Sequence, residues 1–165
     1  MRVVLAPDKF KGTATARELV AAMAAVVEGS GGEPIAMPMA DGGDGTLDAF
    51  GGANRTSTVT GPLGAPIEAA WRLSGGVAVI EMATASGLVL AGGPEGNDPV
   101  GATTRGTGEL LMAAVSRGAK RAIVGLGGSA TTDGGLGAVE AVGTPARLGG
   151  VEVMVATDVL SLIHI

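Results

Sequence analysis

The sequence predicts an α/β protein, with an open and mostly parallel sheet flanked by helices and a smaller α/β part that contains a β-meander. Short apolar runs rich in valine alternate with segments whose apolar residues recur at helical spacing. Many of the 30 glycines directly follow these apolar runs, where an open parallel sheet has its ligand-binding edge. Residues 55–81 instead alternate polar and apolar side chains around turn signals, as antiparallel strands do.

The first elements predict a βα unit followed by a second strand. Residues 2–6 form a short apolar run that is typical of a strand. Residues 15–29 have helical periodicity, and Thr15 with Glu18 forms a capping box at the start of this helix. Residues 34–39 are predicted to be a second, buried strand.

The later elements are a meander and a return to the α/β pattern. A short helix is predicted near residues 46–50, and three strands separated by the turns GPLG and SGG are predicted within residues 55–81. After a loop rich in Gly and Pro at 92–99, the pattern predicts a helix at 107–118, a strand at 119–127, a short helix at 135–143 and a strand at 151–158.

Composition excludes several classes of protein. The net charge is −5, and no basic run interleaves with the three aromatic residues, so nucleic acid is not an expected partner. The absence of cysteine excludes disulfides, thiolate metal sites and a cysteine nucleophile, and it is consistent with a cytoplasmic location. The longest apolar run, LVAAMAAVV, is well short of the ~20 residues that a membrane-spanning helix needs. The only histidine, His164, is not expected to act in catalysis.

Glycine and aspartate gather after the predicted strands. In the stretch GLGGSATTDGG, residues 125–135, glycines expose main-chain N–H groups and hydroxyls are interleaved with them, as in loops that bind phosphate. Asp8, Asp41, Asp44 and Asp133 share this position after strands. Each aspartate alone is also a good capping or turn residue, but carboxylates beside phosphate loops can hold Mg²⁺ or accept a proton from an attacking hydroxyl.

Three cations are candidates to bind an anion. Lys9 and Lys11, in APDKFKGT, follow the first strand and can neutralise phosphate charge or bind a carboxylate, or they can be solvated surface lysines. Arg105, which precedes a helix, has the same two interpretations. GLGGSA satisfies the dinucleotide fingerprint, but no acidic residue lies near the required position ~20 residues further on, and the P-loop pattern does not occur. A non-catalytic binding module and an NAD-type oxidoreductase therefore stay open.

Six motifs, in order and at similar spacing, resemble the type-1 glycerate kinase family: APDKFKGT, ADGGDGT, VTGPLG, VIEMATASGL, DPVGATTRGTGELL and GLGGSATTDGGLGA. The resemblance implies phosphorylation of glycerate by ATP with Mg²⁺, usually at the 2-hydroxyl, in the cleft between two α/β domains. It places the site at or near Asp8, Lys9, Lys11, Asp41, Gly42, Gly43, Asp44, Gly127, Gly128, Ser129, Thr131 and Asp133. From their chemistry we expect catalytic roles for Asp41, Lys11 and Asp8, and metal binding by Asp41 and Asp133. We expect substrate or phosphate binding by Asp133, by Arg105 and by the remaining residues of this set.

The family's members are longer than this chain, which we therefore expect to be an N-terminal fragment. We do not expect this fragment to be active by itself. Its pattern divides into residues 1–54, the first part of a nucleotide and substrate domain; 55–100, an inserted β-rich part of a second domain; and 101–159, an α/β part with the glycine-rich loop. The final residues 160–165, LSLIHI, match nothing expected there and are interpreted as a foreign tail.

Overall fold

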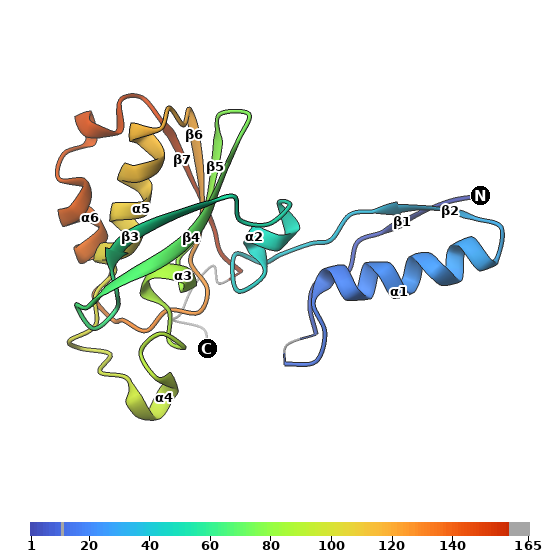
Figure 1. Cartoon of the computed structure of the whole chain (residues 1–165), viewed down its shortest axis with the longest axis horizontal. Coiled ribbons are helices and arrows are strands. Elements are labelled where there is room, and N and C mark those ends of the chain that lie inside the picture. The colour runs from blue at the N-terminus through green and yellow to red at the C-terminus, as the bar shows by residue number, and fades with distance from the viewer. Residues whose placement is uncertain (11, 159–165) are drawn as a thin grey trace.

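The structure is a computed structural model that describes residues 1–10 and 12–158 of the 165-residue chain. Lys11 and the predicted tail at 160–165 thus lie outside the described residues. The described part is an α/β structure with two sheets, one of two strands and one of five (Figure 1). This confirms the fold class that the sequence predicts.

The smaller sheet pairs β1 (Arg2–Leu5) and β2 (Glu33–Ala36) in parallel, and α1 (Ala16–Gly29) connects them. The predicted capping box is present, because the Thr15 hydroxyl accepts from the Glu18 main chain while the Glu18 carboxylate accepts from the Thr15 main chain. Leu5 is buried, whereas Val4 points to the opposite face of the strand and is 58% exposed. Within the part of the chain that the structure describes, this face of β1 is therefore left open at Val4.

The larger sheet is mixed. Its strands follow chain order, β3 (Arg55–Thr60), β4 (Pro66–Ser74), β5 (Val77–Glu81), β6 (Arg121–Gly125) and β7 (Glu152–Ala156). The first two pairings are antiparallel, as the meander predicts, and the last two are parallel. The three predicted meander strands therefore share one sheet with β6 and β7, and this sheet crosses the boundary predicted at residue 100.

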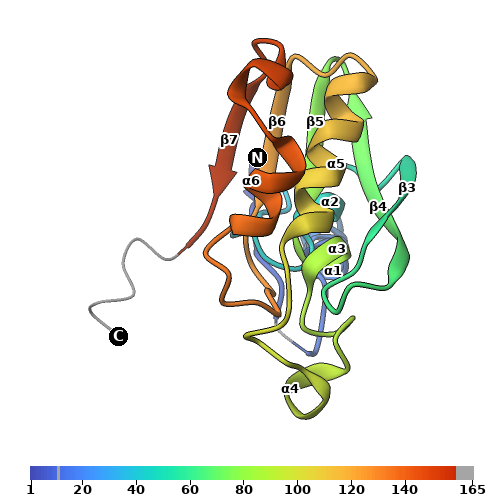
Figure 2. The same cartoon turned by 90° about the vertical axis from the view of Figure 1, so that its left-hand side faces the viewer.

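Two helices cover one face of the larger sheet (Figures 1 and 2). They are α5 (Arg105–Ser116) and α6 (Leu136–Val142). The core beneath them contains Trp71, Ile80 and Leu110, all fully buried. Around these lie the short helices α2 (Thr46–Ala49), α3 (Ala83–Ser86) and α4 (Gly93–Gly96) and the 3₁₀ helix η1 (Pro145–Leu148), of which only α2 was expected.

The segment after β2 links the two sheets. In Figure 1, α2 and the β1–α1–β2 unit extend from the side of the large sheet opposite α5 and α6. Arg17 of α1 donates from its Nε and Nη2 to the main-chain oxygen of Asp48 in α2, at 3.2 and 3.0 Å. The segment after β2 also meets the carboxyl ends of the central strands, because Gly42 bonds to Gly127 after β6 and Leu47 bonds to Glu81 at the end of β5.

Two strands are less buried than their apolar sequences predict. The second strand, expected to be buried over residues 34–39, ends at Ala36, and its residues are half-buried or exposed. Val153, Met154 and Val155 of β7 are likewise 38–56% exposed. An apolar sequence predicts the strand, but whether it is buried depends on what covers it. Val153 and Val155 border a pocket whose other walls include Val139 of α6 and Leu148 of η1, so this face of β7 is covered only in part. No helix in the described part of the chain is long and apolar enough to cross a membrane.

Candidate functional site

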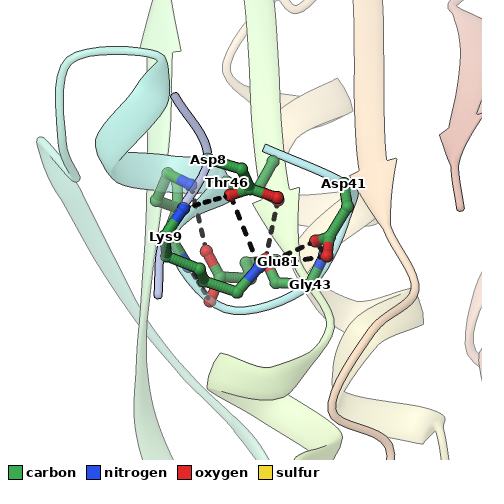
Figure 3. Close-up of polar contacts among 8 residues, drawn as sticks. Asp8, Lys9, Asp41, Gly43, Thr46 and Glu81 are labelled. Carbon is green, nitrogen blue, oxygen red and sulfur yellow. Dashed lines mark hydrogen bonds and ion pairs between the residues drawn. The ribbon is translucent and has the colours of Figure 1, made fainter. Parts of the chain in front are cut away.

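The segments that follow β1 and β2 bring a lysine and two aspartates together (Figure 3). The ammonium nitrogen of Lys9 lies 3.0 Å from Asp41 Oδ1 and 3.1 Å from Asp41 Oδ2, and it donates to both. The same nitrogen is 3.7 Å from Asp8 Oδ1. Three of the predicted site residues therefore form one cluster, as expected for carboxyl ends of parallel strands.

The loop that carries Asp41 is fixed by hydrogen bonds within itself. Asp41 Oδ1 accepts from the Gly43 main chain at 2.8 Å, and the buried Thr46 hydroxyl donates to the Gly43 main-chain oxygen at 2.7 Å. Gly42 and Gly45 have φ angles of 89° and 95°, a left-handed conformation that favours glycine. The ADGGDGT sequence thus encodes a tight loop whose first carboxylate faces Lys9.

The ion pair stabilises the charged form of both partners. The hydrogen bond from the Gly43 main chain, and next the one from Lys9, lower the pKa of the Asp41 carboxyl below its ordinary value. Burial alone would lower the pKa of Lys9, but the hydrogen bond and charge of Asp41, with smaller contributions from Asp8 and Asp44, raise it. At neutral pH the cluster therefore holds an ammonium between carboxylates.

A buried glutamate that the sequence analysis did not single out lies beneath this loop. Glu81, the last residue of β5, is only 7% exposed, and its Oε2 accepts from the Leu47 main chain at 3.0 Å. Burial raises the pKa of the Glu81 carboxyl, and the hydrogen bonds from Leu47 and Gly45 offset this only in part. The sequence feature that could have pointed to Glu81 is a charged residue at the end of the apolar run VAVIE.

The two glycine-rich loops pack directly against each other. The Gly127 main chain donates to the Gly42 main-chain oxygen at 2.9 Å. A Cβ on Gly127 would overlap the backbone of Gly43, and a Cβ on Gly42 would overlap the main-chain oxygen of Ala156 in β7. At these positions glycine allows three strand ends to approach at backbone distance.

A pocket of about 370 Å³ opens beside the cluster. Asp8, Lys9 and Asp44 line one part of it, while Phe10 and Met39 contribute apolar surface. This volume is within the range of small-molecule sites, about 300–1,000 Å³, and the combination of apolar walls with a few charged groups is typical of them.

The hydroxyls of the 125–135 loop bond to neighbouring main chain. Thr131 Oγ1 donates to the Ala102 oxygen and Thr132 Oγ1 to the Pro99 oxygen, both at 2.8 Å. Ser129 Oγ accepts from the Thr131 main chain at 3.1 Å. The Thr131 and Thr132 hydroxyls therefore fasten the loop to the segment that precedes α5, whereas the Ser129 hydroxyl bonds within the loop itself.

Asp133 belongs to a second hydrogen-bond network. Its Oδ2 accepts from the main chain and the hydroxyl of Thr104, both at 2.8 Å, and from the Gly137 main chain at 3.1 Å, while Oδ1 accepts from the Gly135 main chain at 2.9 Å. Burial alone would raise the pKa of Asp133, but these hydrogen bonds together lower it. The carboxylate therefore joins the N-termini of α5 and α6.

The structure thus places the predicted site residues in two groups. Asp8, Lys9, Asp41, Gly42, Gly43, Asp44, Gly127 and Gly128 lie around the lysine cluster and its loops, and a Cβ on Gly128 would lie 3.1 Å from Asp44 Oδ1. Thr131 and Asp133 bond to the 97–104 segment, Ser129 bonds to Thr131 within its own loop, and Arg105 pairs with Glu109 at 3.1 Å.

Two sequence patterns can be weighed against this geometry. In the dinucleotide fingerprint a helix opens directly after the glycines, but here the helix after β6 begins only at Leu136. The described residues include no group of three or more histidine, aspartate or glutamate side chains placed to hold a metal. The cluster does offer carboxylate oxygens, and Mg²⁺ in phosphotransfer sites typically takes one or two of these together with phosphate oxygens and water.

Comparison with known proteins identifies the family. The glycerate kinase family model matches residues 3–159. Glycerate 2-kinase of Escherichia coli K12 is 44% identical over 151 residues, which cover 87% of this chain and 39% of that protein, and glycerate kinase of Bacillus subtilis 168 is 45% identical with the same coverage. A crystal structure from Salmonella typhimurium LT2, assigned as a glycerate kinase 2, matches with a TM-score of 0.74 and 41% identity over 87% of this chain and 41% of that one. The chain spans about two fifths of the length of these relatives, and it belongs to the glycerate kinase family.

Proposed function

We propose that this chain is part of an ATP-dependent glycerate kinase, which transfers the γ-phosphoryl group to a hydroxyl of glycerate, the 2-hydroxyl by analogy with the relative named glycerate 2-kinase. One observation of the structure carries the proposal. Lys9 lies between Asp41 and Asp8 on the wall of a pocket large enough for a small substrate. Cations and carboxylates at the carboxyl ends of strands are the groups that phosphoryl transfer needs.

The proposed chemistry is a direct transfer. The glycerate hydroxyl oxygen forms a bond to the γ-phosphorus, the bond to the β–γ bridging oxygen breaks, ADP leaves, and the hydroxyl proton passes to a carboxylate or water. Lys9 would balance negative charge on the transferred group, with Lys11 proposed for the same task. The lowered pKa of Asp41 suits it better to holding a cation or orienting the hydroxyl than to taking up the proton.

Mg²⁺ would be held beside the lysine cluster. Asp41 is the first candidate ligand, and a bound Mg²⁺ would neutralise charge on the ATP phosphates. Asp133 stays a proposed ligand, but it would have to bind metal while it accepts hydrogen bonds from both helix N-termini. Lys9 and Asp8 would then orient phosphate and acceptor.

The 125–135 loop is proposed to bind phosphate through its main chain. Gly127 and Gly128 lie against the loop that carries Asp41 and Asp44, so their peptide groups border the cluster, although the Gly127 N–H would first have to leave the Gly42 main-chain oxygen. Binding through the hydroxyls of Ser129 and Thr131 would require these groups to leave their present main-chain partners.

The test is an assay of glycerate-dependent ADP release on the chain completed with the C-terminal part of a related glycerate kinase. Asp41→Asn should lower kcat by about 100-fold, because one preorganised charged group is typically worth ~3 kcal/mol in the transition state. Glu28→Gln, an exposed change on α1, is the matched control and should leave kcat unchanged.

One result would contradict the proposed function, and another would contradict only the role of Asp41. ATP binding without glycerate-dependent turnover in the completed protein would make it a nucleotide-binding module. An Asp41→Asn protein that keeps most of its kcat would remove Asp41 from the site while leaving the activity itself intact.

A further inference from the structure

Glu81 ends a central strand in a place where a carboxylate is unfavourable. It is 7% exposed, and β5 is paired with β4 on one side and β6 on the other. Asp44 and Asp48 nearby add like charge, so both burial and neighbouring charges disfavour its ionised form. A buried carboxylate at such a position needs specific hydrogen-bond donors.

The donors come from the loop of the candidate site. Glu81 Oε2 accepts from the Leu47 main chain at 3.0 Å, and Oε1 lies 3.4 Å from the Gly45 nitrogen. The two peptide groups belong to the residues on either side of Thr46, at the start of α2. The first turn of a helix leaves such N–H groups without main-chain partners, so the glutamate satisfies them from a neighbouring strand.

A continuous path of hydrogen bonds leads from this anchor to the ion pair. Thr46 is 2% exposed, and its hydroxyl donates to the Gly43 main-chain oxygen. The Gly43 main chain in turn donates to the Asp41 carboxylate, which accepts from Lys9. The position of Asp41 therefore depends on where residues 43–47 are held.

We infer that Glu81 is a positioning residue, which holds the 41–47 loop on the rigid central strand so that Asp41 meets Lys9. Its consequence for turnover rests on the proposed kinase function, while the positioning itself does not. Glu81 acts only through the main chain of Gly45 and Leu47, and it touches neither Lys9 nor Asp41 among the bonds that the structure shows.

Glu81→Gln is a sharp test because the amide has almost the same shape as the carboxylate. A glutamine offers one acceptor oxygen, and its NH₂ group would face a main-chain N–H, so one of the two loop contacts is lost. Glu109→Gln is the matched control, because Glu109 also accepts from a main chain distant in sequence, that of Thr60 at 2.7 Å.

Amide hydrogen exchange on the completed chain measures the positioning directly. Glu81→Gln should speed exchange at Leu47 at least 10-fold and leave Thr60 unchanged, whereas Glu109→Gln should do the opposite. Unchanged exchange at Leu47 in a folded Glu81→Gln protein would overturn the inference. If this variant does not unfold cooperatively, the same exchange measurement is made on Glu81→Asp, which keeps both carboxylate oxygens but shortens the side chain.

Kinetics measure whether the positioning serves the site. In the wild-type background, Glu81→Gln should lower kcat at least 10-fold. In the Asp41→Asn background the same change should lower kcat by less than 2-fold, because the loop then has no carboxylate to position. If the fold losses in kcat of the two single variants multiply fully in the double variant, Glu81 has a general structural role instead. If the completed wild-type chain shows no glycerate-dependent turnover, the proposed function fails, and the exchange measurement still decides the role of Glu81.

Discussion

Single residues at this site have roles that their neighbours define. Asp41 and Asp133 both follow strands and both precede glycines, and from the sequence both are expected to bind metal. In the structure Asp41 pairs with Lys9, while Asp133 accepts hydrogen bonds from the start of two helices. Removing either carboxylate should therefore have different consequences.

Asp133→Asn should lower the free energy of unfolding by about 2 kcal/mol, because hydrogen bonds to a charged acceptor are typically worth ~1.5–3 kcal/mol and the amide loses part of this set. The measurement is urea unfolding of the completed chain. Glu140→Gln, an exposed change on α6, is the control and should leave the unfolding free energy within about 0.5 kcal/mol. Equal stability of both variants would show that Asp133 does not join the helices.

The ion pair gives a defined dependence on pH. The pKa of Asp41 is lowered from 3.8, so its stabilising contribution is present above this value and is lost as pH falls through the folded-state pKa. The pKa of Lys9 is raised from 10.5, so its contribution is present below 10.5 and is lost as pH rises through the folded-state value.

The difference in unfolding free energy between wild type and Asp41→Asn should thus be constant from about pH 5 to pH 9 and shrink below pH 3.8. Chemical unfolding at a series of pH values measures it. A difference that does not change on acidification would mean that Asp41 is not stabilised as a carboxylate.

At the scale of elements, the glycine-rich loops are packing surfaces as well as proposed ligand loops. Glycine after a strand predicts close backbone approach, but it does not say whether a ligand or another loop makes that approach. Here the GLGG turn approaches the ADGGDGT loop and the end of β7. Whether a ligand or another loop approaches the glycines depends on how the strand ends pack, which the sequence pattern does not show.

Gly127→Ala should destabilise the completed chain by about 2 kcal/mol, because the new methyl group would overlap the backbone of Gly43 and separate the loops. Gly29→Ala is the matched control, since a Cβ there meets open space at the end of α1. Thermal unfolding of both variants measures the effect. If the two variants unfold at the same temperature, the loops do not require contact at this point.

The sequence predicted most elements, and it predicted part of the site. Periodicity located α1, the meander and the strands β6 and β7, because these patterns are local. It overestimated the burial of the strand after α1, because burial depends on elements distant in sequence. It missed Glu81 for the same reason, since its partners Gly45 and Leu47 lie in a different part of the chain.

At the scale of the molecule, apolar side chains on two strands stay exposed within the described residues. One strand is β7, whose Val153, Met154 and Val155 lie on alternating faces, and the other is β1 of the small sheet, with Val4. A complete domain has a net stability of only ~5–15 kcal/mol, so uncovered apolar strands are a serious loss. The relatives continue beyond the matched region, and we expect their additional segments to pack on these apolar side chains.

Residues 1–165 expressed alone should therefore be poorly soluble or partly molten, should bind the dye ANS and should lack glycerate kinase activity. Joining residues 1–159 to the C-terminal part of a related glycerate kinase should restore a sharp thermal transition and activity together. A cooperative melt of the unaltered chain, with glycerate-dependent ADP release, would contradict this expectation.

The close approach of Gly42 to Ala156 also sets an order of events during synthesis. The Lys9–Asp41 pair can form once the first strands have left the ribosome. The loop that carries Asp41, however, packs against Ala156 at Gly42, and this contact can form only when β7 has been made. Contacts between distant parts of a chain form slowly, because a long loop must close before they contribute. The 41–47 loop is therefore among the last parts of this region to reach its final shape on the nascent chain.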